Sequence, residues 1–152
     1  MFEVVSTSSE ETQRLARRIA EVLPDDTVVC FFGDLAAGKT TFITSLAQAL
    51  TGDDALDVTS PTFVYLNIYE GERTVYHFDL YRLDSVEAFL GMGFDEYFSA
   101  GGVTCVEWSE RIESILDDVT LRVIMQHNGD NRRRIRFEGP WPERVFRMEQ
   151  DL

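Results

Sequence analysis

An apolar run that leads into a glycine-bounded loop and then a helical pattern constrains this chain more than any other feature. Residues 27–32 are a continuous apolar run, typical of a central strand that is buried on both faces. An apolar stripe over residues 42–50 predicts a helix that ends at the turn residues 51–54. Between them lies the pattern G-x-x-x-x-G-K-[ST], formed by Gly33, Asp34, Leu35, Ala36, Ala37, Gly38, Lys39 and Thr40. This order predicts a strand that delivers a phosphate-binding loop to a helix N-terminus.

The loop predicts that the chain binds ATP with magnesium. Lys39 is expected to reach the outer phosphates and the Thr40 hydroxyl to complete the magnesium shell, with Thr41 the next polar group on the first turn of the helix. A cation at a helix N-terminus is disfavoured unless an anion neutralises it, so the position of Lys39 favours this role over that of an exposed lysine. Ala36 has less backbone freedom than glycine and limits how tightly the loop can wrap the phosphates, although binding should survive.

Size and composition predict one globular domain. The chain has 152 residues, of which 44% are hydrophobic and 27% charged. We expect the domain over residues 1–139 and a polar C-terminal tail of uncertain order over residues 140–152. No apolar run approaches the ~20 residues of a membrane span, and the N-terminus lacks the features of a secretory signal. We therefore expect a cytoplasmic protein, a monomer by default, in which Cys30 and Cys105 are reduced core thiols.

The charge balance argues against autonomous binding to nucleic acid. The net charge is −13, with 14 basic against 27 acidic residues, and would repel a polyanion. Any nucleic acid must therefore be reached through a partner. The one basic concentration, Arg132, Arg133 and Arg134 followed by Arg136, is either a solvated strand face or a surface for nucleotide or partner.

The remaining pattern predicts a mixed sheet with flanking helices. A helix starts at Ser8 or Ser9, which can cap it, and runs to about residue 23. Hairpins are expected over residues 63–69 with 74–78, and over residues 121–125 with 133–137. A short helix is predicted from residue 85, and residues 103–106 form a buried strand parallel to the first.

Acidic residues follow two predicted strands, where a nucleotide hydrolase needs a carboxylate beside the loop. Such a group holds magnesium or orients the attacking water. Glu107 follows residues 103–106, and Asp79 follows residues 74–78. Glu107 is the stronger candidate because the carboxyl end of a central parallel strand opens on the crevice where open sheets bind ligands.

Three further residues have open interpretations. Thr62, in the segment 60–63, offers a hydroxyl where a segment sensing the terminal phosphate would sit, but Ser60 and Pro61 also favour an ordinary turn. His77 is interpreted as a strand residue rather than a catalyst, because no nucleophile or metal partner lies at an informative spacing. Trp108 belongs either to the core or to a nucleotide pocket.

The order and spacing of four motifs resemble those of the bacterial TsaE (YjeE) family. The motifs are residues 33–42, the segment 60–63, the sequence His-Phe-Asp-Leu-Tyr-Arg-Leu at 77–83 and Val-Glu-Trp-Ser-Glu-Arg at 106–111. The resemblance implies an α/β fold of the P-loop NTPase type, a mixed sheet with parallel core strands, β-hairpins and flanking helices. It also implies an ATPase, weak alone and stimulated by a partner, that supports threonylcarbamoyladenosine (t6A) modification of tRNA by binding and resetting the TsaD–TsaB transferase complex. Contact with tRNA would be indirect, through that complex.

The resemblance also implies roles for individual residues. Lys39 and the loop amides would hold the phosphates of ATP, and Thr40 and Glu107 would hold Mg²⁺. Asp79 matches the functional acid of the family, and Thr62 lies in its switch-like segment. Trp108 and, more loosely matched, Ser8 or Ser9 would belong to the nucleotide pocket. The family usually has glycine in place of Ala36, which puts the hydrolysis rate in question more than binding.

The residues leave other functions to be tested. A small-molecule kinase would share the loop but should carry an arginine-rich lid and an acceptor pocket, neither of which the sequence indicates. A nucleotide-dependent binding module, in which hydrolysis is incidental, fits the acidic surface. A GTPase is disfavoured because the Asn-Lys-x-Asp element is absent.

Overall fold

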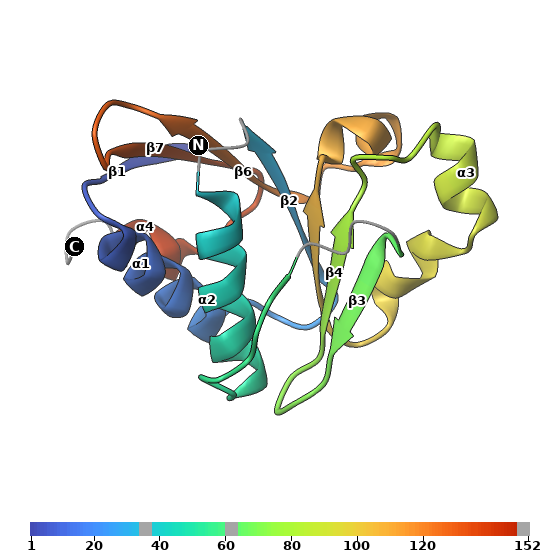
Figure 1. Cartoon of the computed structure of the whole chain (residues 1–152), viewed down its shortest axis with the longest axis horizontal. Helices are drawn as coiled ribbons and strands as arrows, with labels where there is room; N and C mark the ends of the chain where they lie inside the picture. Colours follow the sequence, from blue (N-terminus) through green and yellow to red (C-terminus); the bar gives the residue numbers. More distant parts are fainter. Residues whose placement is uncertain (34–37, 60–63, 149–152) are drawn as a thin grey trace.

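The computed structural model describes residues 1–33, 38–59 and 64–148. Within these ranges seven strands form one sheet in the order β1-β7-β6-β2-β5-β4-β3 (Figure 1). The strands are β1 (Phe2–Ser6), β2 (Thr27–Gly33), β3 (Leu66–Tyr69), β4 (Val75–Asp79), β5 (Val103–Glu107), β6 (Leu121–His127) and β7 (Arg133–Glu138). The helices are α1 (Ser9–Val22), α2 (Lys39–Thr51), α3 (Val86–Gly91) and α4 (Glu143–Met148), with the 3-10 helices η1 (Phe94–Ser99) and η2 (Ser109–Ile115).

The sheet is mixed, with a parallel centre. β2 pairs in parallel with both β5 and β6, and β4 pairs in parallel with β5. The pairs β3–β4, β6–β7 and β1–β7 are antiparallel. This arrangement confirms the predicted fold class, including the parallel strand at 103–106 and both hairpins. The carboxyl ends of β2, β4, β5 and β6 consequently meet at one edge of the sheet.

Helix α1 forms where the capping signals predict it. The Ser8 side chain accepts a hydrogen bond from the Glu11 backbone N–H at 3.1 Å, which satisfies one of the amides that a helix N-terminus leaves unpaired. Leu15, Ala16 and Ile19 recur on the buried face, and the helix ends before Pro24. The apolar stripe thus attaches α1 to the sheet.

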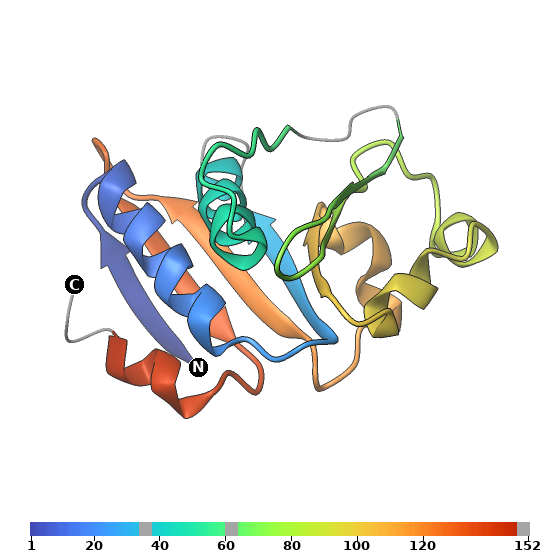
Figure 2. The ribbon, with the colours of Figure 1, turned by 90° about the horizontal axis from the view of Figure 1, so that it is seen from below.

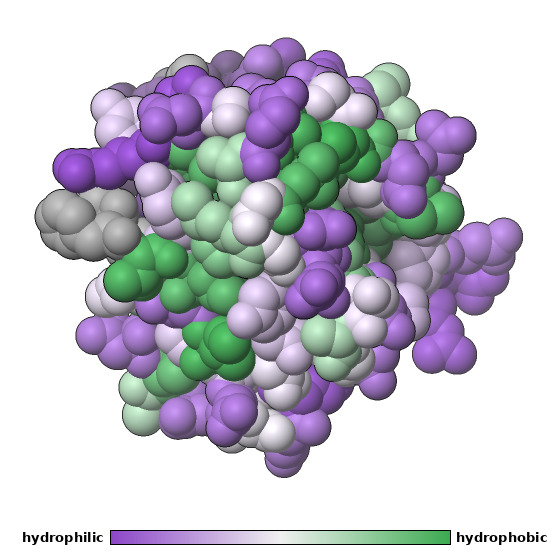
Figure 3. Space-filling view, turned by 90° about the vertical axis from the view of Figure 1, so that its right-hand side faces the viewer, coloured by the Kyte–Doolittle hydropathy of each residue, from purple (hydrophilic) through white to green (hydrophobic). Residues whose placement is uncertain are grey.

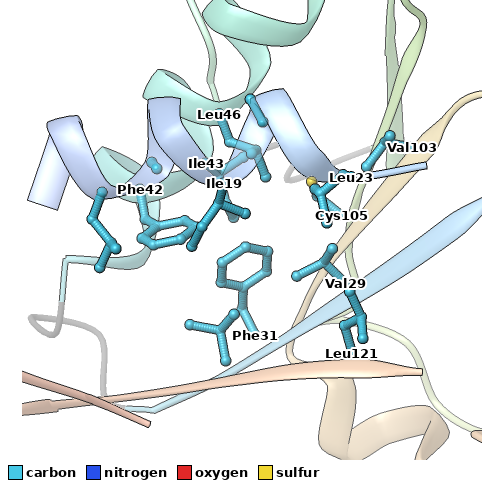
Figure 4. Packing of buried hydrophobic residues seen from close by; sticks show 14 of the residues in the cluster. Ile19, Leu23, Val29, Phe31, Phe42, Ile43, Leu46, Val103, Cys105 and Leu121 are labelled. Carbon is cyan, nitrogen blue, oxygen red and sulfur yellow. The ribbon is translucent and has the colours of Figure 1, made fainter. Parts of the chain in front are cut away.

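Two apolar clusters cover opposite faces of the sheet. On one face, side chains of α1, α2 and α4 pack against the central strands, and Phe31 of β2 points between Phe42 of α2 and Ile19 of α1 (Figures 2 and 4). The rings of Phe31 and Phe42 meet edge to face, with centroids 5.5 Å apart. On the other face, Cys30 of β2 packs with residues of α3 and η2. Because β2 buries side chains on both faces, its sequence is apolar at successive positions rather than alternate ones.

The ends of the chain are more structured than the sequence analysis predicts. β1 was not expected, and it pairs along β7 at the outer edge of the sheet. The expectation of a tail over residues 140–152 is wrong for its first part, because residues 143–148 form α4. Trp141 and Val145 are buried in the core beside α1. Their spacing of four residues places them on one face of a helical turn, a signal too short to stand out among the polar residues around it.

No helix in the described ranges is long and apolar enough to span a membrane.

Candidate functional site

Two rows of alternating side chains bring the strand-end carboxylates to the same place. In β4 the row is Val75, His77 and Asp79, and in the adjacent β5 it is Val103, Cys105 and Glu107. The apolar members belong to the cluster beneath α1 and α2. Since alternate side chains of a strand share a face, His77, Asp79 and Glu107 continue on the face that α2 covers. Asp79 pairs in register with Glu107, so the two predicted acids lie side by side at the carboxyl edge.

Lys39, the first residue of α2, is held in this site as a nearly buried cation. It is 5% exposed, and its Nζ donates a hydrogen bond to the Gly33 carbonyl oxygen at 2.7 Å. The same Nζ lies 5.1 Å from the ring centroid of Trp108. Lys39 is also the only lysine of the chain. A buried ammonium beside carboxylates and a helix N-terminus is suited to a polyanionic ligand.

The glycines that bound the loop have conformations that favour glycine. Gly33 has φ +131°, and a Cβ there would overlap the Met125 carbonyl oxygen of β6. Gly38, the N-cap of α2, has φ +92° and no side chain that caps the helix. Thr40 and Thr41 follow in the first turn of α2, where Thr40 is exposed and Thr41 is half-buried. The predicted loop residues Asp34, Leu35, Ala36 and Ala37, and the switch residue Thr62, lie outside the described residues.

Asp79 is a buried carboxyl whose ionisation the site opposes. Burial raises the pKa of Asp79, and the neighbouring Glu107 carboxylate raises it further. The Tyr81 backbone N–H, which donates to Oδ1 at 3.0 Å, and the cation of Lys39 act in the opposite direction. Two adjacent carboxylates with one lysine leave negative charge that an additional cation would compensate.

Glu107 is paired with His77, which sequence reasoning did not connect to the site. His77 Nε2 and Glu107 Oε2 are 2.8 Å apart, and both side chains are buried. The prediction that His77 is a strand residue is correct, but the absence of a nearby partner in sequence was misleading because the partner lies 30 residues away. The signal that reveals it is the alternation of β4 and β5, once their pairing is known.

Trp108 turns the chain away from the sheet directly after Glu107. It has φ +58°, which is unusual for a bulky residue and marks a position fixed by its surroundings. Its ring contacts Tyr81, with centroids 4.9 Å apart, while Lys39 lies over the ring. Trp108 therefore borders the site between Lys39 and the exposed Tyr81, and it also packs against the apolar cluster that contains Cys30.

A pocket of about 70 Å³, termed the second pocket to distinguish it from the site at the carboxyl edge, lies between the start of α1 and the start of α2. Its lining residues are Ser8, Ser9, Thr12, Gly38, Thr41, Asn131 and Arg133. Ser8 and Ser9 therefore lie in the same pocket as Gly38 and Thr41 at the start of α2. Arg133 shares a strand face with Ile135 and Phe137 of the core, and the alternation of β7 directs it towards α2.

The arginine cluster consequently divides between different surroundings. Arg133 lines the pocket, with its Nε within 3.5 Å of where a Cβ on Gly38 would lie. Arg134 is directed to the other side of β7 and forms an ion pair with Glu3 of β1 at 3.1 Å. Arg136 pairs with Glu138 at 3.0 Å. The cluster is neither a uniform basic patch nor wholly a solvated face.

The donor atoms at the carboxyl edge fit a magnesium ion that arrives with a nucleotide. Mg²⁺ takes oxygen ligands and is usually held by one or two carboxylates together with phosphate oxygens. Glu107 and Asp79 supply carboxylates, and Thr40 supplies a hydroxyl at the start of α2. Across residues 1–33, 38–59 and 64–148, no group of three or more His, Cys, Asp or Glu side chains is arranged to hold a metal ion by itself.

Comparison with known proteins identifies the family. A family model described as threonylcarbamoyl adenosine biosynthesis protein TsaE matches residues 6–135. The chain belongs to the TsaE family. The tRNA threonylcarbamoyladenosine biosynthesis protein TsaE of Treponema pallidum is 39% identical to it over 131 residues, 86% of this chain and 96% of the relative. The TsaE protein of Bacillus subtilis is 38% identical over 133 residues, 87% of this chain and 82% of the relative.

A solved structure shows the same fold. The crystal structure of Bacillus subtilis YdiB matches this TsaE family member with a TM-score of 0.74 and 31% identity, covering 99% of this chain and 91% of that chain. The resemblance drawn from four motifs is therefore confirmed at the level of family and fold. The roles of individual residues in binding and catalysis stay predictions.

Proposed function

We propose that this TsaE family member is an ATPase that uses Mg²⁺-ATP to bind and reset the TsaD–TsaB complex during t6A modification of tRNA. The observation that carries the proposal is the pairing of Asp79 and Glu107 at the ends of adjacent strands, beside Lys39 at the start of α2. Nucleotide hydrolysis uses a lysine that binds the phosphates, an acid that holds magnesium and a group that orients the attacking water, and this arrangement can supply all three. The names of the matched relatives support the assignment to the t6A pathway.

Each site residue has a distinct part in this proposal. Lys39, with the loop amides, binds the outer phosphates, and Thr40 and Glu107 hold the magnesium ion, which neutralises charge on the transferring phosphoryl group when bound. Asp79 orients the water that attacks the terminal phosphorus. The bond from that phosphorus to the bridging oxygen breaks, which yields ADP and inorganic phosphate. Trp108 and the pocket containing Ser8 and Ser9 bind the remainder of the nucleotide.

The surface supports a protein partner and indirect contact with tRNA. A net charge of −13 disfavours direct binding to a polyanion. The face around β3 and α3 carries apolar patches among hydrophilic ones (Figure 3). Exposed apolar side chains of these elements and of the adjoining turns include Val64, Ile68, Leu90 and Met92. We assign this face to the binding of the transferase complex. The protein would then lie in the cytoplasm together with that complex.

Lys39→Ala tests the site. We expect the variant to lose ATP binding measured by calorimetry, and with it the ATP turnover that TsaD–TsaB stimulates and support of t6A formation in a reconstituted assay. Arg144→Ala, an exposed cation of α4 outside the site, is the matched control and should behave as wild type. Retention of both binding and t6A support by Lys39→Ala would refute the proposal.

Glu107→Ala separates hydrolysis from a pure binding role. If the variant binds ATP and TsaD–TsaB but no longer supports t6A formation, a module that acts only by binding is excluded. If it still supports t6A formation, hydrolysis is incidental and the ATPase assignment is wrong. Wild-type protein should release only inorganic phosphate, and a phosphorylated small molecule would instead indicate a kinase.

A further inference from the structure

A buried histidine occupies a position where the sheet would otherwise place an apolar side chain. His77 lies between Val75 and Asp79 in a row whose first member belongs to the core, and it is 1% exposed. Its ring packs near Tyr69 of β3, with centroids 6.2 Å apart. An aliphatic residue of similar volume would fill this space without burying polar atoms. Packing alone therefore does not account for a histidine at this position.

The hydrogen bonds of His77 point to one partner. Nε2 lies 2.8 Å from Glu107 Oε2, whereas Nδ1 is buried without a hydrogen-bond partner among the described residues. An ionised carboxylate can only accept, so Nε2 must carry the proton of this hydrogen bond. Leaving Nδ1 unsatisfied costs stability, which the hydrogen bond to Glu107 offsets.

The contact restricts the orientation of the carboxylate. Because His77 is enclosed by β3 and β5, its Nε2 is fixed relative to the sheet, and the bond sets the rotation of the Glu107 carboxylate about its last side-chain bond. Carboxylates that bind metal ions are commonly held by such hydrogen bonds, and loss of the supporting group weakens metal affinity or activity about 10- to 100-fold.

We infer that His77 is a positioning residue, which holds Glu107 in the orientation in which its carboxylate binds the magnesium of the nucleotide. The inference rests on the proposed function, because it concerns the same site. His77 itself contacts neither nucleotide nor ion. Its role is expressed through the magnesium dependence of nucleotide binding, while binding without magnesium should be insensitive to it.

Two substitutions of similar polarity form a matched test. In His77→Gln the side-chain amide nitrogen reaches the position of Nε2 and can donate to Glu107, whereas in His77→Asn it falls short at the position of Nδ1. ATP binding to the full chain is measured by calorimetry, first in EDTA and then over a series of Mg²⁺ concentrations. We expect both variants to bind ATP in EDTA like wild type. His77→Asn should need about 10- to 100-fold more Mg²⁺ for half-maximal enhancement, and His77→Gln should be restored towards wild type.

The outcomes separate this inference from the proposed function. If Asn and Gln variants respond alike to Mg²⁺, or if both lose ATP binding in EDTA through a folding defect, the positioning role is overturned while the proposed function stands. If wild-type protein binds no ATP, the proposed function fails irrespective of His77.

A readout without nucleotide or metal completes the test. The chain has two histidines, so a His127→Gln background leaves His77 alone. The ¹⁵N spectrum of the ligand-free protein should show His77 protonated at Nε2. Protonation at Nδ1 instead would overturn the inference.

Discussion

Replacing Gly33 with alanine tests the junction between β2 and the predicted phosphate loop. Gly33 has φ +131°, and an alanine Cβ would overlap the Met125 carbonyl oxygen across the β2–β6 pair. An L-residue held in such a conformation is strained by about 1–3 kcal/mol. The overlap also displaces the end of the pairing, and one weakened backbone hydrogen bond adds ~0.5–1.5 kcal/mol. We therefore expect Gly33→Ala to lower the free energy of unfolding by about 2–4 kcal/mol.

Urea denaturation followed by circular dichroism measures this loss, and thermal unfolding should show the midpoint lowered by roughly 5–15 °C for a chain of this size. Two control glycines separate the contributions. Gly129 has φ +88° and open space within 4 Å of the point where an alanine Cβ would lie, so Gly129→Ala reports backbone strain alone. Gly91, at the end of α3, has open space and no positive φ, and Gly91→Ala should lie within about 1 kcal/mol of wild type. If Gly33→Ala costs no more than Gly129→Ala, the contact with Met125 does not constrain the junction and the reasoning is refuted.

Three further predictions concern buried groups. Burial raises the pKa of Cys30 to about 12 and also raises that of Cys105, so both thiols should react with a thiol reagent only when the protein unfolds. Stability should fall between about pH 9 and pH 12, where unfolded thiols ionise and folded Cys30 does not. Burial raises the pKa of Asp79, so its ionisation opposes folding. Asp79→Asn should therefore stabilise the ligand-free protein at pH 7, by a margin that shrinks as the pH falls towards 4. Equal urea midpoints for the variant and the wild type at pH 7 would contradict this. Trp141→Ala should cost about 3–5 kcal/mol in urea denaturation, whereas a loose tail would make it neutral.

Local signals in the sequence predict the elements around the site well. The apolar run of β2, the capping serine of α1 and the acids after β4 and β5 each follow from neighbouring residues. That Asp79 and Glu107 are in register is a property of strand order, which their sequences do not encode. The same is true of His77 and Glu107, whose hydrogen bond depends on which strands are neighbours.

Other structural features cannot be predicted from the sequence because their local signal is weak or indicates a different structure. β1 is only five residues long, and its pairing with β7 decides its conformation. Trp108 adopts a positive φ where a glycine would have indicated a turn. Trp141 and Val145 are two apolar positions in a polar segment, and only their packing beside α1 shows that they belong to the core.

The pairing of β1 with β7 has a consequence for how the protein is made. The second pocket takes Ser8 and Ser9 from the segment after β1, and Asn131 and Arg133 from the turn and start of β7. During translation, this pocket cannot assemble until more than a hundred residues that follow Ser9 have left the ribosome. A ribosome that stalls before β7 would therefore release a fragment with the phosphate-loop sequence but without that pocket, and such incomplete chains should be poor competitors for nucleotide.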